Sequence, residues 1–225
     1  KTVVGPRTRA ILPVDLFGWS FDQEFLTLGA DFRSLPIIED ACQAVGGARR
    51  GAHGFGGTFG DVGVWSFNGS KQVPAGEAGA VLTDDDAIAE RARLFVSHGE
   101  NFGSFRVGMN GRLNEPTALI AYHGLTAIPG AIKKRQRLAS ILNRCLDRVA
   151  GIETLPDPRG HALYVFPLVL ATGVDRAAFA ERLRSMGVEV GEGYIQPILA
   201  DYAAFKGCRA APLPVARRLS SETLC

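Results

Sequence analysis

A short apolar run that leads directly into a lysine-bearing loop constrains this chain most strongly. Residues 62–67 predict a buried strand, and the turn Asn68-Gly69-Ser70 and then Lys71 follow it. Residues 80–82 form a second apolar run, which predicts that the sheet resumes after a loop of small residues. Lys71 is therefore expected at the end of a buried strand, where desolvation can make its amine a nucleophile. Alone, a lysine just past a strand is usually a solvated loop residue.

Composition narrows the class of protein and of partner. A chain of 225 residues that is 46% hydrophobic can bury a sizeable core, as one domain or as one domain with part of a second. Its 25 basic and 23 acidic residues nearly cancel, so we expect no nucleic-acid partner. No apolar run approaches the roughly 20 residues that span a bilayer, so we expect no membrane association.

The four cysteines predict the compartment. Cys42, Cys145, Cys208 and Cys225 are far apart and form no C-x-x-C pair. This spacing predicts free thiols in a reducing compartment, and therefore a cytoplasmic protein. The chain begins without methionine and stops after an apolar C-terminal run, so we interpret it as a piece of a longer protein.

Strand and helix patterns alternate through the first half of the chain. Residues 9–14 and 35–40 predict strands, and residues 21–29 predict a helix between them. Later helices are expected from the acidic start at residues 84–86 to Gly99, and over residues 114–128 until Pro129-Gly130 breaks the second. This order predicts an α/β fold with a mostly parallel sheet flanked by helices. Ligands bind beyond the carboxyl ends of strands in such sheets.

The second half predicts a connecting helix and a smaller domain. Residues 131–150 form an amphipathic pattern with Leu138, Ile141 and Leu142 in its apolar stripe. Residues 162–170, 175–186 and 188–190 then predict a strand, a helix and a strand. We therefore predict part of a large domain at 1–130, a connecting helix at 131–150, and part of a small α+β domain at 151–225. The basic residues of the helix are interpreted as its solvated face; they are Lys133, Lys134, Arg135 and Arg137.

Two further patterns carry no predicted chemistry. Residues 54–60 resemble a phosphate loop, but Phe59 stands where a dinucleotide fingerprint needs glycine, so we predict a glycine-rich surface turn. The histidines have no metal-ligand spacing, so we predict no metal site and structural roles for His53, His98, His123 and His161.

Three strand-end residues together predict a cofactor site. The Asp40 carboxylate can hold a cationic ring nitrogen, the Ser66 hydroxyl can hold a phosphate, and the Lys71 amine can form a Schiff base. This set of groups fits pyridoxal 5'-phosphate. Ordinary structural interpretations remain open, because Asp40 can also cap a helix and Ser66 can bond the backbone.

The order of several motifs resembles one family of enzymes. Residues 36–44 (PIIEDACQA), 57–61 (GTFGD), 65–71 (WSFNGSK), 76–79 (GEAG) and 108–115 (GMNGRLNE) are similar to the DegT/DnrJ/EryC1/StrS aminotransferases. The resemblance covers nearly the whole chain and extends weakly to Tyr164 and Gly193-Tyr194. It implies the fold of fold-type I pyridoxal-phosphate transferases.

The resemblance also implies a role for individual residues. Lys71 would bond the cofactor and shuttle a proton, and Asp40 would pair with its ring nitrogen. Gln43 would lie against the ring or its phenolic oxygen, and Ser66 would bind the phosphate. Asn110 would reach into the site of a neighbouring subunit, which implies a homodimer. Gln43 can otherwise be an ordinary polar helix residue, and Asn110 a turn residue with positive φ.

The function implied is amino transfer from an amino acid, expected to be glutamate, to a keto sugar that is expected to be nucleotide-linked. The alternatives are a pyridoxal-phosphate-binding regulator or inactive paralogue, and a related sugar dehydratase. Lys71 argues against the dehydratase, because those relatives carry histidine at that position. Glu77 and Arg112 are interpreted as structural. Since the family's N-terminal region is not in this sequence, we expect these 225 residues alone to bind the cofactor poorly.

Overall fold

The computed structural model describes residues 4–21, 35–48, 54–101, 104–153, 156–208 and 211–225. The chain divides into two compact units. The first contains residues 8–136 and 159–164, and the second contains residues 137–158 and 165–225 together with the N-terminal segment before residue 8. The predicted helix at residues 21–29 falls almost entirely outside the described residues.

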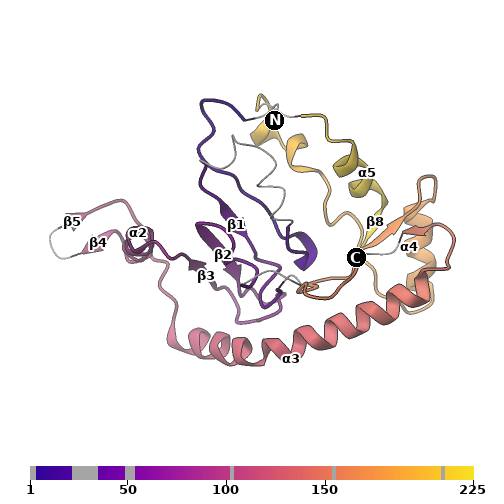
Figure 1. Ribbon diagram of the computed structural model, residues 1–225, viewed down its shortest axis with the longest axis horizontal. Helices are drawn as coiled ribbons and strands as arrows, with labels where there is room; N and C mark the ends of the chain where they lie inside the picture. Colours follow the sequence, from indigo (N-terminus) through magenta and orange to yellow (C-terminus); the bar gives the residue numbers. More distant parts are fainter. Residues whose placement is uncertain (1–3, 22–34, 49–53, 102–103, 154–155, 209–210) are drawn as a thin grey trace. The chain divides into compact units, whose positions relative to one another are not determined.

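A mixed sheet forms the centre of the first unit. Its strands β1 (Ile38–Asp40), β2 (Val62–Ser66) and β3 (Gly79–Leu82) lie side by side in that order (Figure 1). β1 and β2 are parallel, whereas β2 and β3 are antiparallel. The segment before η1 (Leu16–Gly18) also runs parallel to β1, through bridges from Ile11 to Ile37 and from Val14 to Asp40. Parallel pairings thus outnumber the antiparallel one, which confirms the predicted, mostly parallel sheet, but residues 9–14 form two isolated bridges and not the predicted strand.

Small and branched apolar side chains fill the space beside this sheet. Ala41, Ala44 and Val45 follow β1 and are completely buried, and Val73 is buried in the loop after β2. Ala121, Ile128 and Ile132 of the long helix α3 belong to the same cluster. The core therefore lies next to the loop that carries Lys71, which gives that loop a rigid support.

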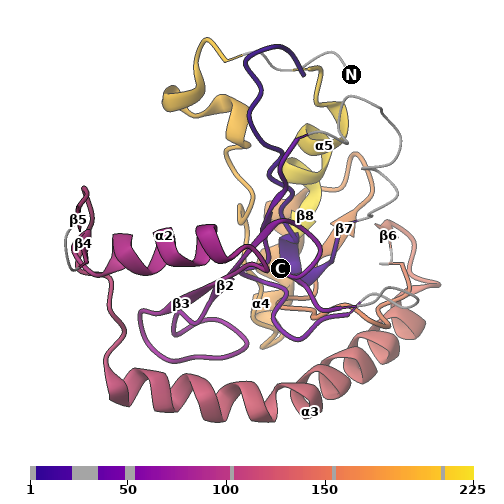
Figure 2. The ribbon, with the colours of Figure 1, turned by 60° about the vertical axis from the view of Figure 1, so that its left-hand side comes forward.

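The helix α2 (Asp86–Val96) begins where the acidic run predicts. Asp85 is its N-cap, and the carboxylate accepts hydrogen bonds from the amides of Ala87 and Ile88 at 2.8 and 3.0 Å. Beyond α2 follow β4 (Glu100–Asn101) and β5 (Ser104–Phe105), an antiparallel pair. In Figures 1 and 2 this pair lies at the end of α2 that is remote from β3.

The break predicted at Pro129-Gly130 is wrong. A single helix, α3 (Glu115–Leu146), runs through both residues, as Figure 2 shows. The reason is packing on both sides of the proline: Ile128 and Ile132 are buried, whereas Pro129 and Gly130 are exposed. The helix therefore tolerates the one backbone hydrogen bond that proline removes, because tertiary contacts hold its flanks.

The apolar stripe of the predicted connecting helix is largely exposed in this chain. Leu138, Ile141 and Leu142 are all exposed on α3. The small Ala139, which follows Leu138 in the sequence, is buried. Of the four basic residues, Lys133, Lys134 and Arg137 are exposed as predicted. Arg135 is half-buried and differs from that prediction.

The second unit contains a small antiparallel sheet. Its strands are β6 (Ile152–Glu153), β7 (Leu168–Leu170) and β8 (Thr223–Leu224), with β7 in the middle. The helices are α4 (Arg176–Ser185), capped by Asp175, and α5 (Pro214–Glu222); the short 3-10 turns η3 (Leu199–Asp201) and η4 (Ala203–Phe205) lie between them in sequence. Leu170, Ala180 and Leu224 form its buried core.

Two strand predictions in this unit require correction. The strand expected over residues 162–170 is confined to β7, because residues 162–164 instead bond the backbone of η1 in the first unit. Residues 188–190 form no strand; instead Glu192 makes a single bridge to Leu224. The helix over residues 175–186 is confirmed by α4. The boundaries 1–130, 131–150 and 151–225 remain a domain prediction.

All four cysteines carry free thiols, as expected. Within the described residues, no helix is long and apolar enough to cross a bilayer.

Candidate functional site

Lys71 follows a tight turn at the end of β2. Its amide donates a hydrogen bond to the Asn68 carbonyl at 2.8 Å. The Asn68 side chain accepts hydrogen bonds from the amide and hydroxyl of Ser70 at 3.0 and 2.9 Å, and its Nδ2 donates to Glu77 at 2.7 Å. The Asn68 side chain therefore links Ser70, before the lysine, to Glu77, after it, and stabilises the turn. Glu77 acts as a structural partner of this turn, in line with the role interpreted from the sequence.

The ε-amine of Lys71 lies against an aromatic ring. Its Nζ is 4.6 Å from the ring centroid of Tyr164, and the lysine is half-buried. A cation at this distance is attracted by the negative face of the ring. Lys71 is thus a loop residue, as that interpretation has it, but it is only partly solvated and its amine has an aromatic partner. Sequence reasoning assigned no role to Tyr164.

Asp40 ends β1 without capping a helix. Residues 41–48 form turns, and Asp40 Oδ1 accepts a hydrogen bond from the Cys42 amide at 3.1 Å. The pKa of the Cys42 thiol is raised to about 12, first by burial and then by Asp40, whereas the positive charge of Lys71 acts in the opposite direction. The carboxylate and the amine thus both act on one thiol, which stays neutral at physiological pH.

Gln43 and Ser66 both have hydrogen-bond partners in the backbone. Gln43 Oε1 accepts a hydrogen bond from the Phe17 amide at 2.6 Å, and the Gln43 carbonyl accepts one from Gln72 Nε2. Gln43 lies in a turn, so the alternative of an ordinary helix residue is wrong. Ser66 Oγ accepts a hydrogen bond from the Asn68 amide at 3.3 Å, which leaves the hydroxyl proton for another partner.

Asn110 lies on a different segment. It forms an isolated antiparallel bridge with Ser97, beyond the end of α2, and it is exposed. Its φ is not among the positive values of the described residues, so the alternative of a turn asparagine with positive φ is wrong. The structure thus places Asp40 and Ser66 at the ends of the paired strands β1 and β2, Gln43 and Lys71 in the loops that follow these strands, and Asn110 at the surface.

Two buried carboxyl groups, those of Asp15 and Glu39, lie in the segment that pairs with β1 and in β1 itself. Glu39 accepts hydrogen bonds from the amides of Gly57 and Phe59 at 2.7 and 2.9 Å. Asp15 Oδ1 accepts one from the Phe21 amide at 2.8 Å. Burial first and then Glu39 raise the pKa of Asp15 to about 7. The sequence gives no sign of this pair, because the two residues are 24 positions apart.

The glycine-rich loop at residues 54–60 is not a surface turn throughout. Gly56 and Gly57 are buried, and the Gly56 carbonyl accepts a hydrogen bond from Trp65 Nε1 at 2.7 Å. Gly63 of β2 must be glycine, because a Cβ there would overlap the Gly57 carbonyl. The loop is therefore packed on β2 and held by Glu39.

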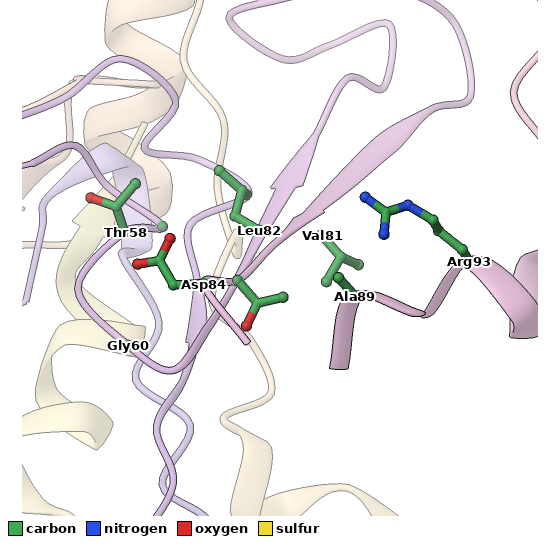
Figure 3. A pocket seen from close by; sticks show the side chains of 9 residues that line it. Thr58, Gly60, Val81, Leu82, Asp84, Ala89 and Arg93 are labelled. Atoms are coloured by element: carbon green, nitrogen blue, oxygen red, sulfur yellow. The ribbon is translucent and has the colours of Figure 1, made fainter. Parts of the chain in front are cut away.

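A separate hollow of about 370 Å³ lies beside this loop. Figure 3 shows Thr58 and Asp84 on one side of it, and Ala89 and Arg93 of α2 on the other. None of the five predicted site residues is among its described lining residues. The hollow is therefore distinct from the strand-end site.

The described histidines have structural contacts or lie at the surface. The ring of His161 stacks on Trp19 at 4.3 Å between centroids, and its Nδ1 accepts a hydrogen bond from the Ser20 amide at 3.2 Å. His98 and His123 are exposed, and His53 lies outside the described residues. Among the residues that the structure describes, no group of three His, Cys, Asp or Glu side chains could hold a metal ion.

Comparison with known sequences identifies the class of protein to which this fold and the lysine after β2 belong. The chain belongs to the DegT/DnrJ/EryC1/StrS aminotransferase family, whose sequence model matches residues 1–225. It is 33% identical over 228 residues to the erythromycin biosynthesis sensory transduction protein EryC1 of Saccharopolyspora erythraea, covering 100% of this chain and 62% of that protein.

It is also 30% identical over 237 residues to dTDP-3-amino-3,4,6-trideoxy-alpha-D-glucose transaminase of Micromonospora megalomicea subsp. nigra, covering 99% of this chain and 61% of that protein. The crystal structure of DesI in the presence of its TDP-sugar product aligns with a TM-score of 0.86 at 30% identity, over 99% of this chain and 58% of that chain. These matches confirm the predicted family and fold. The chain spans about three fifths of the length of these relatives.

Proposed function

We propose that the protein containing this chain is a pyridoxal-phosphate-dependent aminotransferase, which moves an amino group from glutamate to a keto group of a nucleotide-linked sugar. The observation that carries the proposal is the half-buried Lys71 in the loop after β2, with its Nζ 4.6 Å from the Tyr164 ring centroid, and Asp40 at the end of the neighbouring parallel strand β1. Family membership supports amino transfer. Similarity to a dTDP-amino-sugar transaminase and to DesI supports a nucleotide-linked sugar as acceptor.

The side chains at the strand ends fit pyridoxal phosphate by their chemistry. The Asp40 carboxylate would hold the ring nitrogen protonated, the Ser66 hydroxyl proton would be donated to the phosphate, and the Lys71 amine would bond the aldehyde carbon. When bound, this cofactor supplies an electron sink for exchange of an amino group and a carbonyl oxygen. Lys71 would also carry the proton between the carbon atoms that change, because an amine that is released from the cofactor can act as a general base and acid.

Gln43 and Asn110 have different parts in this proposal. Gln43 would lie against the ring while its Oε1 holds the Phe17 amide. Asn110 would reach the phosphate of a neighbouring subunit, and its exposure supports such a contact in a homodimer. The four free thiols support a cytoplasmic location.

The decisive experiment compares Lys71→Ala with Lys134→Ala, an exposed lysine of α3, in the protein containing this chain. We expect Lys71→Ala to lose the absorption band of the lysine–cofactor bond and at least about 10³-fold in the rate of glutamate-dependent amino transfer. Lys134→Ala should keep both. Retained turnover in Lys71→Ala would contradict the assignment. A panel of nucleotide-linked keto sugars then identifies the acceptor.

A second candidate function is a cofactor-binding regulator without catalysis. The relative EryC1 carries the name of a sensory transduction protein, which favours considering it. Borohydride trapping of Lys71 does not separate the two functions, since both hold the cofactor. The half-reaction separates them: an aminotransferase converts glutamate to 2-oxoglutarate in one turnover, whereas a regulator does not.

A further inference from the structure

We propose that Tyr164 is a positioning residue for Lys71, and that its ring is the resting place of the lysine amine whenever Lys71 is not bonded to a cofactor. This inference rests on the proposed function of Lys71. It concerns only side chains of the first compact unit, which contains both residues. Tyr164 is absent from the set of residues that the sequence predicts for the site.

The geometry shows the amine in contact with this ring. Lys71 Nζ lies 4.6 Å from the Tyr164 centroid, well inside the ~6 Å range over which an aromatic face attracts a cation. The attraction uses none of the N–H donors of the amine in a directed hydrogen bond. The ring therefore holds the position of the nitrogen without blocking the bond that it must form.

Tyr164 is itself held by the backbone around it. Its amide donates to the Phe17 carbonyl at 2.8 Å, and Arg135 Nη1 donates to the carbonyls of Leu163 and Tyr164 at 2.9 Å each. Leu163 has a φ of 53°, a conformation that a branched side chain rarely adopts. Such strain persists only where surrounding contacts impose it, and it is concentrated at functional sites.

A glycine makes this arrangement possible. A Cβ at Gly18 would lie 2.7 Å from the amide nitrogens of both Leu163 and Tyr164. The turn at η1 and residues 163–164 can therefore approach each other only with glycine at position 18. Arg135, which the sequence suggested was solvated, is the helix residue that fixes the other side of the segment.

The hydroxyl of Tyr164 fixes the ring to the lysine loop. Its Oη donates to Ser70 Oγ at 3.3 Å, Ser70 Oγ donates to Asn68 Oδ1 at 2.9 Å, and Asn68 Nδ2 donates to Glu77 at 2.7 Å. Each donor in this chain has one acceptor, and the directions are consistent. This chain of hydrogen bonds therefore fixes the position of the Tyr164 ring relative to the turn before Lys71.

The two parts of Tyr164 should have separable effects. In the proposed reaction Lys71 alternates between a bonded nitrogen and a free amine. A long flexible side chain gains a defined position in its free form only from an external contact, which here is the ring. The ring therefore favours the free form of the lysine, and the hydroxyl sets where the ring lies.

The test measures the free and bonded forms directly, without turnover. The protein containing this chain is loaded with pyridoxal phosphate and titrated with methylamine, which competes with Lys71 for the cofactor. Borohydride is then added, and the fraction of Lys71 that carries the reduced adduct is measured by peptide mass spectrometry. We expect Tyr164→Leu to need about 2- to 30-fold more methylamine for half displacement than wild type, because the freed amine has lost its cation–π partner.

Matched variants separate ring, hydroxyl and general effects. Tyr164→Phe keeps the ring, so the methylamine concentration for half displacement should stay within about twofold of the wild-type value and below that of Tyr164→Leu. Ser70→Ala should give the same value as Tyr164→Phe, and the double variant should show no further change. Tyr122→Leu removes an exposed tyrosine of α3 and should leave the titration unchanged. Should Tyr164→Leu fail to fold, Tyr164→Met removes the ring while keeping an apolar side chain.

The outcomes distinguish this inference from the function on which it rests. If wild type forms no Lys71 adduct, the proposed role of Lys71 fails. If wild type forms the adduct but the leucine and methionine variants titrate as wild type does, Lys71 stands and the role of Tyr164 is overturned. An equal shift in Tyr164→Phe and Tyr164→Leu would likewise overturn the role of the ring.

Discussion

Asp15 Oδ2 is buried, accepts no hydrogen bond from a described donor, and belongs to a carboxyl group that interacts with that of Glu39. Both side chains are fully buried. Two ionised carboxylates in such a place would repel each other, and one proton between them removes the repulsion and satisfies Oδ2. We infer that Asp15 carries this proton, because its pKa is the one that burial and the neighbouring Glu39 raise, whereas both oxygens of Glu39 already accept amide hydrogen bonds.

Asp15→Asn should therefore change how stability depends on pH. The pKa of Asp15 rises from 3.8 to about 7 on folding, so the folded state binds this proton more tightly and the group's stabilising contribution is lost as pH rises from about 4 to about 7. Asparagine mimics the protonated acid at every pH. We expect Asp15→Asn to be more stable than wild type at pH 8, with the advantage shrinking at pH 5, in urea unfolding at both values. A pH-independent difference would contradict the shared proton.

Glu39→Ala should destabilise the first unit strongly. The substitution leaves the amides of Gly57 and Phe59 without their charged acceptor, at a cost of about 3–5 kcal/mol in the free energy of unfolding. Glu90→Ala removes an exposed carboxylate of α2 and should change it by less than about 0.5 kcal/mol. Chemical denaturation of both variants at pH 7 checks the contrast, and similar values for the two would show that Glu39 does not hold the loop.

Two glycine-to-alanine substitutions should have opposite signs. Gly63→Ala places a Cβ against the Gly57 carbonyl. It should lower the free energy of unfolding by about 1–3 kcal/mol, because two backbone segments must separate. At Gly130, in the interior of α3, an added Cβ meets nothing within 4 Å. Gly130→Ala should therefore raise the free energy of unfolding by about 0.5–1 kcal/mol. Thermal melts of the pair are the measurement. A stabilising Gly63→Ala would mean that the loop does not pack on β2.

Pro129→Ala tests the continuity of α3. In a continuous helix, alanine restores the backbone hydrogen bond to the Leu125 carbonyl and should raise the free energy of unfolding by about 1–3 kcal/mol. Circular dichroism should show helical content that is unchanged or slightly higher. A true helix break at this position would predict no gain, since the proline would then suit the turn.

Local patterns predicted the elements that local interactions determine. The strand that leads to Lys71, the acidic start of α2 and the helix α4 all follow from side chains within a few positions of the element. The family resemblance was also readable, because its motifs are short and ordered. The prediction failed at Pro129, where a local helix breaker is overruled by buried isoleucines on both sides.

The sequence by itself determined where the chemistry-bearing side chains occur: Asp40 and Ser66 lie within the C-terminal ends of apolar runs long enough to be strands, and Lys71 follows the second run. Only the tertiary structure decided what surrounds them. Tyr164 reaches Lys71 from 93 positions away, and Asp15 meets Glu39 across parallel segments, because backbone pairing and core packing bring distant residues together. The periodicity of apolar residues indicates which face of a helix or strand a side chain lies on, whereas the residue that it contacts there depends on the whole fold.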